Sequence, residues 1–419
     1  MSEQPCPAEP RADTPAPAKP AGWALAQAAL LYTARTALGL VFVLSGWLKA
    51  NDPIGFALKL EDYSLALGHE PPAMMALLVA GALVAAVEFT LGAMLVLGLH
   101  KRLAAAAATL FMLAMTALTV WLVIANPVSD CGCFGDMVVL THAQSLAKNI
   151  VMLALCAALI RWGTRLGGVT GRGEAWMLWM PLGLACVIYA AWSVYNLPAA
   201  DFRPYHEGAD LATLRRTGGL PPGGYDVKIV YERGGKTLLL DADDEDPDST
   251  WTYVETRRLP RKSNPLGIAT WRDHLGDVAE LWALDSEGSD RTDDILDTPG
   301  HTLLVTIPRM ATADETCAGS LNLLHDMAAE QGIAFHCLTA GSALEQQRWT
   351  DYTGAEYPCL TADERTLWTV VRSNPGLVLL RDGVVQRKWS SWNLHQAQTA
   401  IEALLSETAQ TEENNPSTP

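Results

Sequence analysis

The run AMMALLVAGALVAAVEFTLGAMLVLGL, residues Ala73–Leu99, contains one charged side chain, Glu88. About 20 consecutive apolar residues suffice for a helix to cross a lipid bilayer, and abundant Ala and Gly are typical of membrane helices that pack closely. A water-soluble helical core could explain one such run, but five occur in succession. The N-terminal half therefore predicts a membrane α-helical bundle with spans at about Gln27–Leu48, Ala73–Leu99, Leu103–Ile124, Ala143–Arg161 and Ala175–Leu197.

The basic residues outside the spans predict how this bundle is oriented. No Lys or Arg occurs between Ile124 and Lys148, whereas the short loop after the second span and the loop after the fourth span are basic. Because loops rich in Lys and Arg stay in the cytoplasm, we expect a multi-pass protein of the bacterial inner membrane with a cytoplasmic N-terminus and a periplasmic C-terminal domain. The residues expected on the cytoplasmic side are Arg11, Lys19, Lys101, Arg102, Arg161, Arg165 and Arg172.

Both ends of the chain have compositions that favour disorder. Residues 1–26 begin with a segment rich in Pro and Ala, and they lack the small-residue cleavage pattern of a secretory signal. We therefore expect a disordered tail before a first span that remains in the protein. Residues 408–419 are expected to form a second disordered tail.

Charge separates the chain into two halves. Residues 1–199 hold 11 basic and 11 acidic side chains, so the whole formal net charge of −16 lies in residues 200–419. This predicts an acidic soluble part after a neutral membrane domain. No basic stripe interleaved with aromatic residues occurs, so nucleic acid is not expected as a partner.

The first part of the acidic half, residues 199–295, predicts a β-rich connecting region. Val227–Tyr231 and Lys236–Leu240 flank Gly234-Gly235, which is a signal for a β-hairpin. Asp241–Ser249 is an acidic loop, for which a solvated turn is a more economical explanation than a cation site.

From residue 296 to 407 the pattern changes to alternating strands and helices. This alternation predicts a parallel core, to which a final hairpin adds antiparallel strands. The expected strands are Thr302–Ile307, Ile333–Thr339, Tyr357–Leu360, Leu377–Arg381 and Val384–Trp389, and the expected helices are Cys317–Gln331, Ala343–Tyr352, Glu364–Val371 and Leu394–Leu405.

This order of elements resembles a thioredoxin-like α/β fold, in which a cis-proline precedes the third core strand. Pro375 is placed as its counterpart. The redox motif is incomplete, because Cys317 has no C-x-x-C partner and Asp314 stands where peroxiredoxins have Thr or Ser. We therefore expect Cys317, Cys337 and Cys359 to act as small apolar residues in or near the core, and we do not expect this domain to catalyse redox chemistry alone.

The chemistry is expected in Asp130-Cys131-Gly132-Cys133-Phe134-Gly135-Asp136, a short connection between two spans. The glycines allow a tight turn that brings both sulfur atoms together. A disulfide across one residue closes a small, strained ring, and such bridges are easily reduced. Cys131 and Cys133 are therefore predicted to be a redox pair, and Lys49 or Lys148 is the cation expected to stabilise a thiolate.

Two alternatives for this loop remain open. Cys131 and Cys133 could form a purely structural disulfide. The loop could also bind zinc or copper through Cys131, Cys133, Asp136 and His142, whose side chains suit either metal, although their spacing matches no known zinc finger. Without a metal, Asp136 and His142 would be a helix cap and an interfacial side chain.

The segment Leu44–Pro53, followed by Asp62-Tyr63, resembles the first-span exit of DoxX-like membrane proteins, and the cysteine loop is similar to that of the methylamine utilisation protein MauE. The resemblance covers about Leu30–Ile160. Ser373–Gly383 is similar to the tail of longer DoxX-family proteins that carry an appended thioredoxin-like domain. This resemblance implies a redox-associated membrane protein, because MauE is implicated in maturation of methylamine dehydrogenase and a DoxX relative is part of a thiosulfate:quinone oxidoreductase.

Three functional hypotheses follow. The chain could be a thiol–disulfide exchange protein acting on a periplasmic thiol protein. It could instead be a component of a quinone-linked oxidoreductase, with a membrane quinone as cofactor and a partner subunit. A non-catalytic scaffold that presents the C-terminal domain would tolerate loss of both cysteines.

Arg35 and Glu88 are predicted to pair within the bilayer. Counted from the cytoplasmic ends of their spans, their depths differ by only about 4–5 Å, and isolated charges at such depths are costly. The pair would be either a structural staple between two helices or a proton or quinone site below the cysteine loop.

Overall fold

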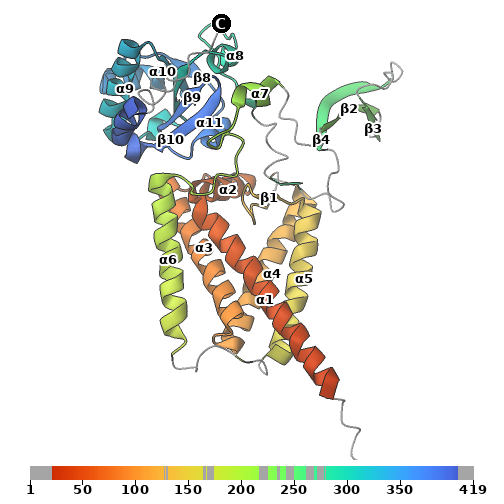
Figure 1. Ribbon diagram of the computed structural model, residues 1–419. Helices are drawn as coiled ribbons and strands as arrows, with labels where there is room; N and C mark the ends of the chain where they lie inside the picture. The colour runs from red at the N-terminus through yellow and green to blue at the C-terminus, as the bar shows by residue number, and fades with distance from the viewer. Residues whose placement is uncertain are drawn as a thin grey trace, which may run out of the picture.

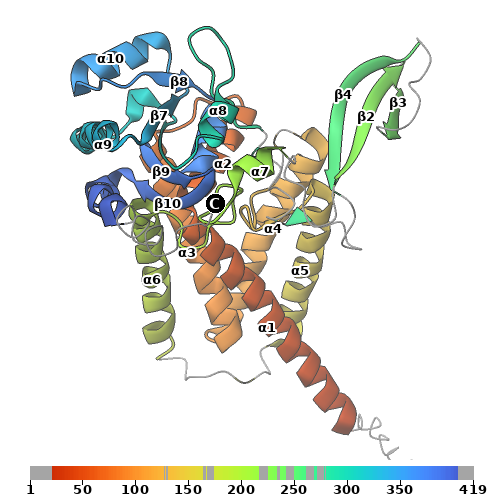
Figure 2. The same ribbon diagram turned by 45° about the horizontal axis from the view of Figure 1, so that its top comes forward.

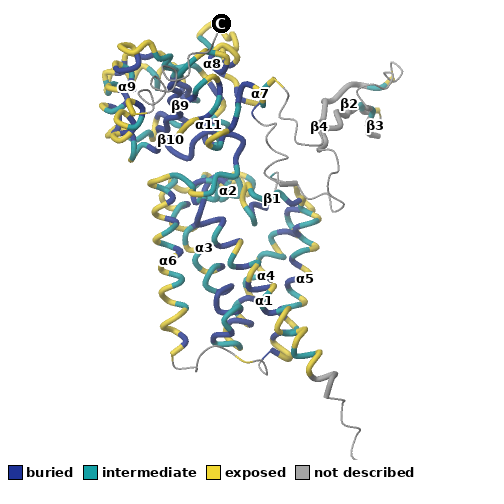
Figure 3. The backbone as a smooth tube through the Cα atoms, in the orientation of Figure 1, coloured by how far each residue is buried: buried dark blue, intermediate teal, exposed yellow. Residues whose placement is uncertain are grey.

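The computed structural model describes residues 21–126, 128, 131–163, 167, 174–216, 225–233, 236–241, 250–260, 269–270, 278 and 280–403. Among these residues, five helices are long and apolar enough to cross a membrane, which confirms the five predicted spans. They stand side by side in one bundle (Figure 1), and apolar side chains on their outer faces are exposed, as in α6 (Figure 3). Their bounds are α1 Ala21–Asn51, α3 Met74–Leu97, α4 Lys101–Ala125, α5 His142–Trp162 and α6 Trp176–Asn196.

Helix α1 includes the last six residues of the predicted disordered tail, because the segment from Ala21 to Gln27 consists mainly of good helix formers. The rest of that tail, residues 1–20, lies outside the described residues. The whole predicted C-terminal tail, residues 408–419, lies outside them too, as do Arg165, Arg172 and Asp130.

Glycines set the contact between α1 and α3. A Cβ atom added at Gly46 would lie 2.5 Å from the backbone nitrogen of Phe89, and one added at Gly92 would lie 2.5 Å from that of Val43. The two backbones therefore touch, as small residues permit in membrane helices. This contact fixes the register of the antiparallel pair, so that residues 45–49 of α1 lie beside residues 85–89 of α3.

A short helix, α2 (Pro53–Ala66), lies across the end of the bundle at which the cysteine loop is found (Figure 1). The Asp52 side chain caps it by accepting a hydrogen bond from Gly55 N at 2.9 Å, and Pro53 occupies its first turn, where no backbone donor is needed. This cap turns the chain sharply out of α1. As a result, the acidic residues of α2 lie at the membrane end that faces the C-terminal domain.

The C-terminal domain contains a five-stranded sheet in the order β10-β9-β6-β7-β8. Strands β6, β7 and β8 are parallel, whereas β9 and β10 are antiparallel additions, as the sequence predicts. Helix α9 and helical residues 394–403 cover one face, and α11 with α7 covers the other. The bounds are β6 His301–Ile307, β7 Ala334–Thr339, β8 Cys359–Thr361, β9 Gly376–Arg381, β10 Val384–Ser390, α7 Leu211–Arg216, α8 Thr292–Leu296, α9 Ala318–Gln331, α10 Ala343–Thr353 and α11 Glu364–Val370.

The connecting region forms a separate antiparallel sheet in the order β3-β2-β4, which stands away from the C-terminal domain (Figure 2). Pairing of β2 with β3 confirms the predicted hairpin, whose Gly234-Gly235 turn lies outside the described residues. Of the predicted acidic loop, the structure describes only Asp241. The bounds are β2 Tyr225–Arg233, β3 Lys236–Asp241 and β4 Thr252–Pro260, and the two-residue strands β1 Val138–Val139 and β5 Ala269–Thr270 pair with each other.

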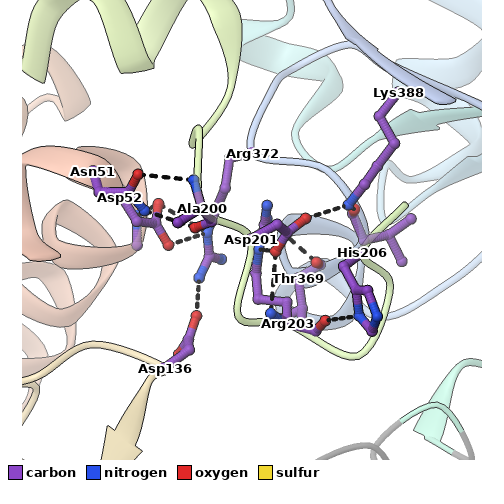
Figure 4. Close-up of polar contacts among 12 residues, drawn as sticks. Asn51, Asp52, Asp136, Ala200, Asp201, Arg203, His206, Thr369, Arg372 and Lys388 are labelled. Carbon is purple, nitrogen blue, oxygen red and sulfur yellow. Dashed lines mark hydrogen bonds and ion pairs between the residues drawn. The ribbon is translucent and has the colours of Figure 1, made fainter. Parts of the chain in front are cut away.

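The connection that leaves α6 is fixed at both ends (Figure 4). Asn51 donates to the carbonyl of Ala200 at 2.7 Å and accepts from its backbone nitrogen at 3.1 Å. The next residue, Asp201, binds two cations. Lys388 Nζ and Arg203 Nε each lie 2.7 Å from one of its carboxylate oxygens. The C-terminal domain is therefore attached to the bundle by more than a flexible linker.

Candidate functional site

Cys131 and Cys133 lie in a tight loop that precedes the N-terminal end of α5. Their sulfur atoms are 2.8 Å apart and both cysteines are free. Gly132 and Gly135 have φ angles of 63° and 52°, in the left-handed region that favours glycine. The two glycines thus allow the turn that brings the thiols together, as the sequence predicts.

The carbonyl groups of both cysteines are held by the helices beneath them. The Tyr63 hydroxyl of α2 donates to the Cys131 carbonyl at 2.9 Å. Lys49 Nζ of α1 donates to the Cys133 carbonyl at 3.1 Å, and the Ser45 hydroxyl lies 2.8 Å from the same oxygen. The backbone of the loop is therefore fixed by the helices α1 and α2, so the two thiols are held in place relative to each other.

Lys49 also forms a buried ion pair with Glu88 of α3 at 2.8 Å. Ser45 lies 2.8 Å from both Lys49 Nζ and Glu88 Oε2, so the lysine places its three donors on Ser45, Glu88 and Cys133. Ionisable groups within membrane spans are costly and usually functional. This network connects the cysteine loop to charges inside the bundle.

The two thiols differ in acidity. The pKa of Cys131 is lowered to about 5, chiefly by the mutual hydrogen bond and further by Ser145 and Lys148, while burial opposes these effects. The same hydrogen bond and burial raise the pKa of Cys133 well above its ordinary value. These opposite directions favour Cys131 over Cys133 as the thiolate of the pair.

Lys148 lies at the beginning of α5, close to the loop. Its ammonium group is 4.7 Å from the centre of the Phe134 ring, a cation–π distance. From there it attracts both sulfur atoms electrostatically. Both lysines predicted to stabilise a thiolate therefore lie at the loop. Lys49 binds its backbone, and Lys148 lies near its sulfur atoms.

The predicted pair between Arg35 and Glu88 is wrong. The Arg35 guanidinium donates to the Gly167 carbonyl at 2.9 Å and lies over the Tyr32 ring. Because Gly46 sets the register of α1 against α3, Glu88 lies level with Ser45, and Arg35 lies about 15 Å further along the helix. Counting from the ends of spans cannot give this register.

The proposed metal ligands are not brought together. His142 Nε2 lies 2.8 Å from the Val128 carbonyl, and Asp136 forms an ion pair with Arg372. Among the described residues, no group of three or more His, Cys, Asp or Glu side chains is placed to hold a metal. Asp136 is not a helix cap either, because Thr141 caps α5.

Arg372 joins the C-terminal domain to the cysteine loop (Figure 4). It is buried, and its guanidinium lies 2.9 Å from Asp52 and 3.1 Å from Asp136. The sequence did not single out Arg372, although it directly precedes the Ser373–Gly383 segment that carries a family resemblance. The Asn374–Pro375 peptide bond is cis, as predicted.

The C-terminal domain contains one disulfide and a single free thiol among its described residues. Cys337 and Cys359 form a disulfide between β7 and β8, so the expectation that they are free apolar residues is wrong. Their pairing depends on two strands being neighbours, which spacing alone does not reveal. Cys317 is free and buried, and burial together with Asp314 raises its pKa to about 12.

A cavity of about 30 Å³ lies beneath Cys133, where α1, α3, α4 and α5 meet. Its polar wall is made by Ser45, Glu88, Lys148 and Asn149, and the remainder is Phe, Met and Val. Such a volume holds one or two water molecules. It has no room for the ring of a quinone.

The membrane part of the chain matches a known family. Residues 27–162, which include most of α1, all of α2 to α5 and the cysteine loop, match the model of the methylamine utilisation protein MauE. No curated protein matches the chain.

Proposed function

Starting from this MauE-like membrane segment, we propose that the protein performs thiol–disulfide exchange at the outer face of the cell membrane through Cys131 and Cys133. The observation that carries the proposal is the pair itself, with sulfur atoms 2.8 Å apart and opposite shifts of pKa. A thiolate beside a protonated thiol is the arrangement expected of an attacking and a resolving cysteine.

In the proposed reaction, the Cys131 thiolate attacks a disulfide of another protein. One sulfur–sulfur bond breaks as the mixed disulfide forms, and the released substrate thiolate takes up a proton. Cys133 then loses its proton and attacks the Cys131 sulfur, which closes the Cys131–Cys133 disulfide and releases the second substrate thiolate. Two electrons thus pass from the cysteine pair to the substrate, and the reverse sequence oxidises a substrate dithiol.

The reverse direction is the one we propose for the cell. A stabilised Cys131 thiolate favours the reduced pair, so its disulfide is a good oxidant. The family name of the matching segment refers to methylamine utilisation, and the MauE resemblance points to the maturation of a disulfide-rich exported protein. We therefore propose an exported protein that acquires disulfides as the substrate. Each turnover leaves the pair reduced, and a second disulfide-bearing protein of the periplasm then accepts the two electrons and re-forms the Cys131–Cys133 disulfide.

Trapping tests the exchange. With Cys133→Ser, Cys131 has no resolving partner, so mixed disulfides with other proteins should accumulate and disappear on reduction. They would be counted on non-reducing gels after acid quenching and alkylation. Cys131→Ser should trap little, and Cys156→Ser, which alters a buried thiol of α5, should behave like the parent. Equal capture by Cys131→Ser would contradict the assigned roles.

We also propose that the cysteine loop and the C-terminal domain face the periplasm. The Arg372–Asp136 ion pair requires them to share a side of the membrane, and the basic loops predict that the opposite side is cytoplasmic. Reporter fusions at Gly171 and Asn415 should therefore differ, the first active as a cytoplasmic reporter and the second as an exported one. Matching signals from the two fusions would refute this orientation.

A further inference from the structure

Three arginines of the C-terminal domain bind carboxylates of the membrane half. Arg309 Nη2 lies 2.7 and 2.8 Å from the two oxygens of Glu61, and Arg365 lies 2.6 Å from Asp62. The third is Arg372, described above. Together they form an interface, here called the arginine contact, made by Arg309, Arg365 and Arg372 with Asp52, Glu61, Asp62 and Asp136.

The arginine contact uses one particular end of the C-terminal domain. Arg309 follows β6, and its backbone nitrogen and carbonyl are both hydrogen-bonded to the Asn374 side chain, at 3.3 and 2.8 Å. Arg372 lies two residues before Asn374. The end of the sheet that bears the cis Asn374–Pro375 bond is therefore the end that meets the cysteine loop.

Arg372 is fixed on three sides. Nε lies 2.9 Å from Asp52, Nη2 lies 3.1 Å from Asp136, and Nη1 donates to the Trp368 carbonyl at 2.9 Å. Asp52 is the cap of α2, whereas Asp136 follows Cys133 by three residues. One buried guanidinium thus connects the cysteine loop, the membrane helices and α11.

The charges around the thiols explain how the contact between Arg372 and Asp136 affects the cysteine pair. Lys148 faces them from α5, while Lys49 and Glu88 below the loop neutralise each other. The loop has two acidic side chains, of which Asp130 lies outside the described residues and Asp136 is paired with Arg372. Without that compensation a negative charge next to the loop would disfavour a thiolate.

We infer that the C-terminal domain acts on the cysteine pair of its own chain, with Arg372 as a positioning residue that neutralises Asp136 and holds the cysteine loop in its reactive geometry. This inference rests on the proposed redox function of the pair. It gives the domain a role that needs no thiol of its own. Consistent with that role, Cys317 is buried and Cys337 is bonded to Cys359.

The test measures Cys131 directly in the reduced full-length protein in detergent or nanodiscs. The rate of iodoacetamide alkylation at Cys131 is quantified by peptide mass spectrometry from pH 4 to 9. The midpoint of the curve of rate against pH reports thiolate formation, and its plateau at high pH reports how accessible the sulfur atom is. Arg372→Gln should raise the midpoint by about one pH unit. Arg372→Lys retains the charge but not the planar set of donors, so its midpoint should lie between those of the parent and Arg372→Gln.

Arg381→Gln is the matched control, because Arg381 is a half-exposed arginine of the same domain whose ion-pair partner is the neighbouring Asp382. Its midpoint should equal that of the parent. An unchanged midpoint in Arg372→Gln overturns the inference, and so does a change in the plateau alone. If Arg372→Gln does not accumulate, Asp136→Asn is measured instead; removing this carboxylate while Arg372 remains should lower the midpoint, and an unchanged or raised midpoint decides against the inference. Mixed-disulfide trapping is independent of this readout, so failure of the proposed exchange would be seen separately.

Discussion

Glu88→Gln is expected to destabilise the helix bundle by about 3–5 kcal/mol, because it leaves the Lys49 ammonium buried without a counter-charge. Both side chains of this pair are only 5% exposed. The loss should appear as a lower unfolding temperature in detergent and as a lower midpoint in denaturant. Thiol–disulfide exchange should fall with it, because Lys49 also holds the Cys133 carbonyl.

The double variant Lys49→Met/Glu88→Gln separates charge from packing. Removing both charges should recover most of the stability, since apolar replacements of a buried pair are often neutral. Exchange should not recover to the same extent, because the donor to Cys133 is gone. Glu70→Gln, at an exposed position after α2, is the control. A double variant as unstable as Glu88→Gln would show that the pair is not the source of the effect.

Asp201→Asn is expected to cost about 3–5 kcal/mol of stability in the C-terminal domain, because two buried cations lose their shared carboxylate. Lys388 and Arg203 are both buried, and each lies 2.7 Å from Asp201. Thermal unfolding and limited proteolysis of the full-length protein should reveal it. Asp326→Asn, an exposed carboxylate on α9, should leave both measurements unchanged.

The Asp201 carboxylate also predicts that the C-terminal domain loses stability in acid. Burial would raise the pKa of Asp201, but Arg203 and Lys388 outweigh it and the pKa is lowered. A lowered pKa in the folded state contributes stability above the unfolded value of about 3.9, and this contribution is lost as pH falls below it. The domain of Asp201→Asn should therefore lose less stability than the parent between pH 5 and 2. Parallel acid profiles would contradict this.

Sequence alone is sufficient for the features that are local. The five spans follow from runs of apolar residues, and the mixed sheet follows from alternating strands and helices. The cysteine loop was identifiable because Gly132 and Gly135 lie within it. In each case the information sits in one short stretch of chain, so no knowledge of distant neighbours is needed.

The errors concern partners that are far apart in sequence. Glu88 pairs with Lys49 rather than Arg35 because Gly46 and Gly92 let two helices approach at one register, which counting residues cannot supply. The Cys337–Cys359 bridge requires β8 to lie beside β7. Asp136 and Arg372 are separated by 236 positions, so only the assembled structure brings them together.

That separation also has a consequence for biogenesis. Chains are made from the N-terminus at about 5–20 residues per second, so Arg372 emerges from the ribosome roughly 10–50 s after Asp136. Throughout that interval the nascent chain presents its cysteine loop, with Lys49 and Glu88 already made, while Arg372 has yet to be synthesised. Newly inserted chains therefore carry the cysteine loop without its Arg372 ion pair until the C-terminal domain has been made and has folded.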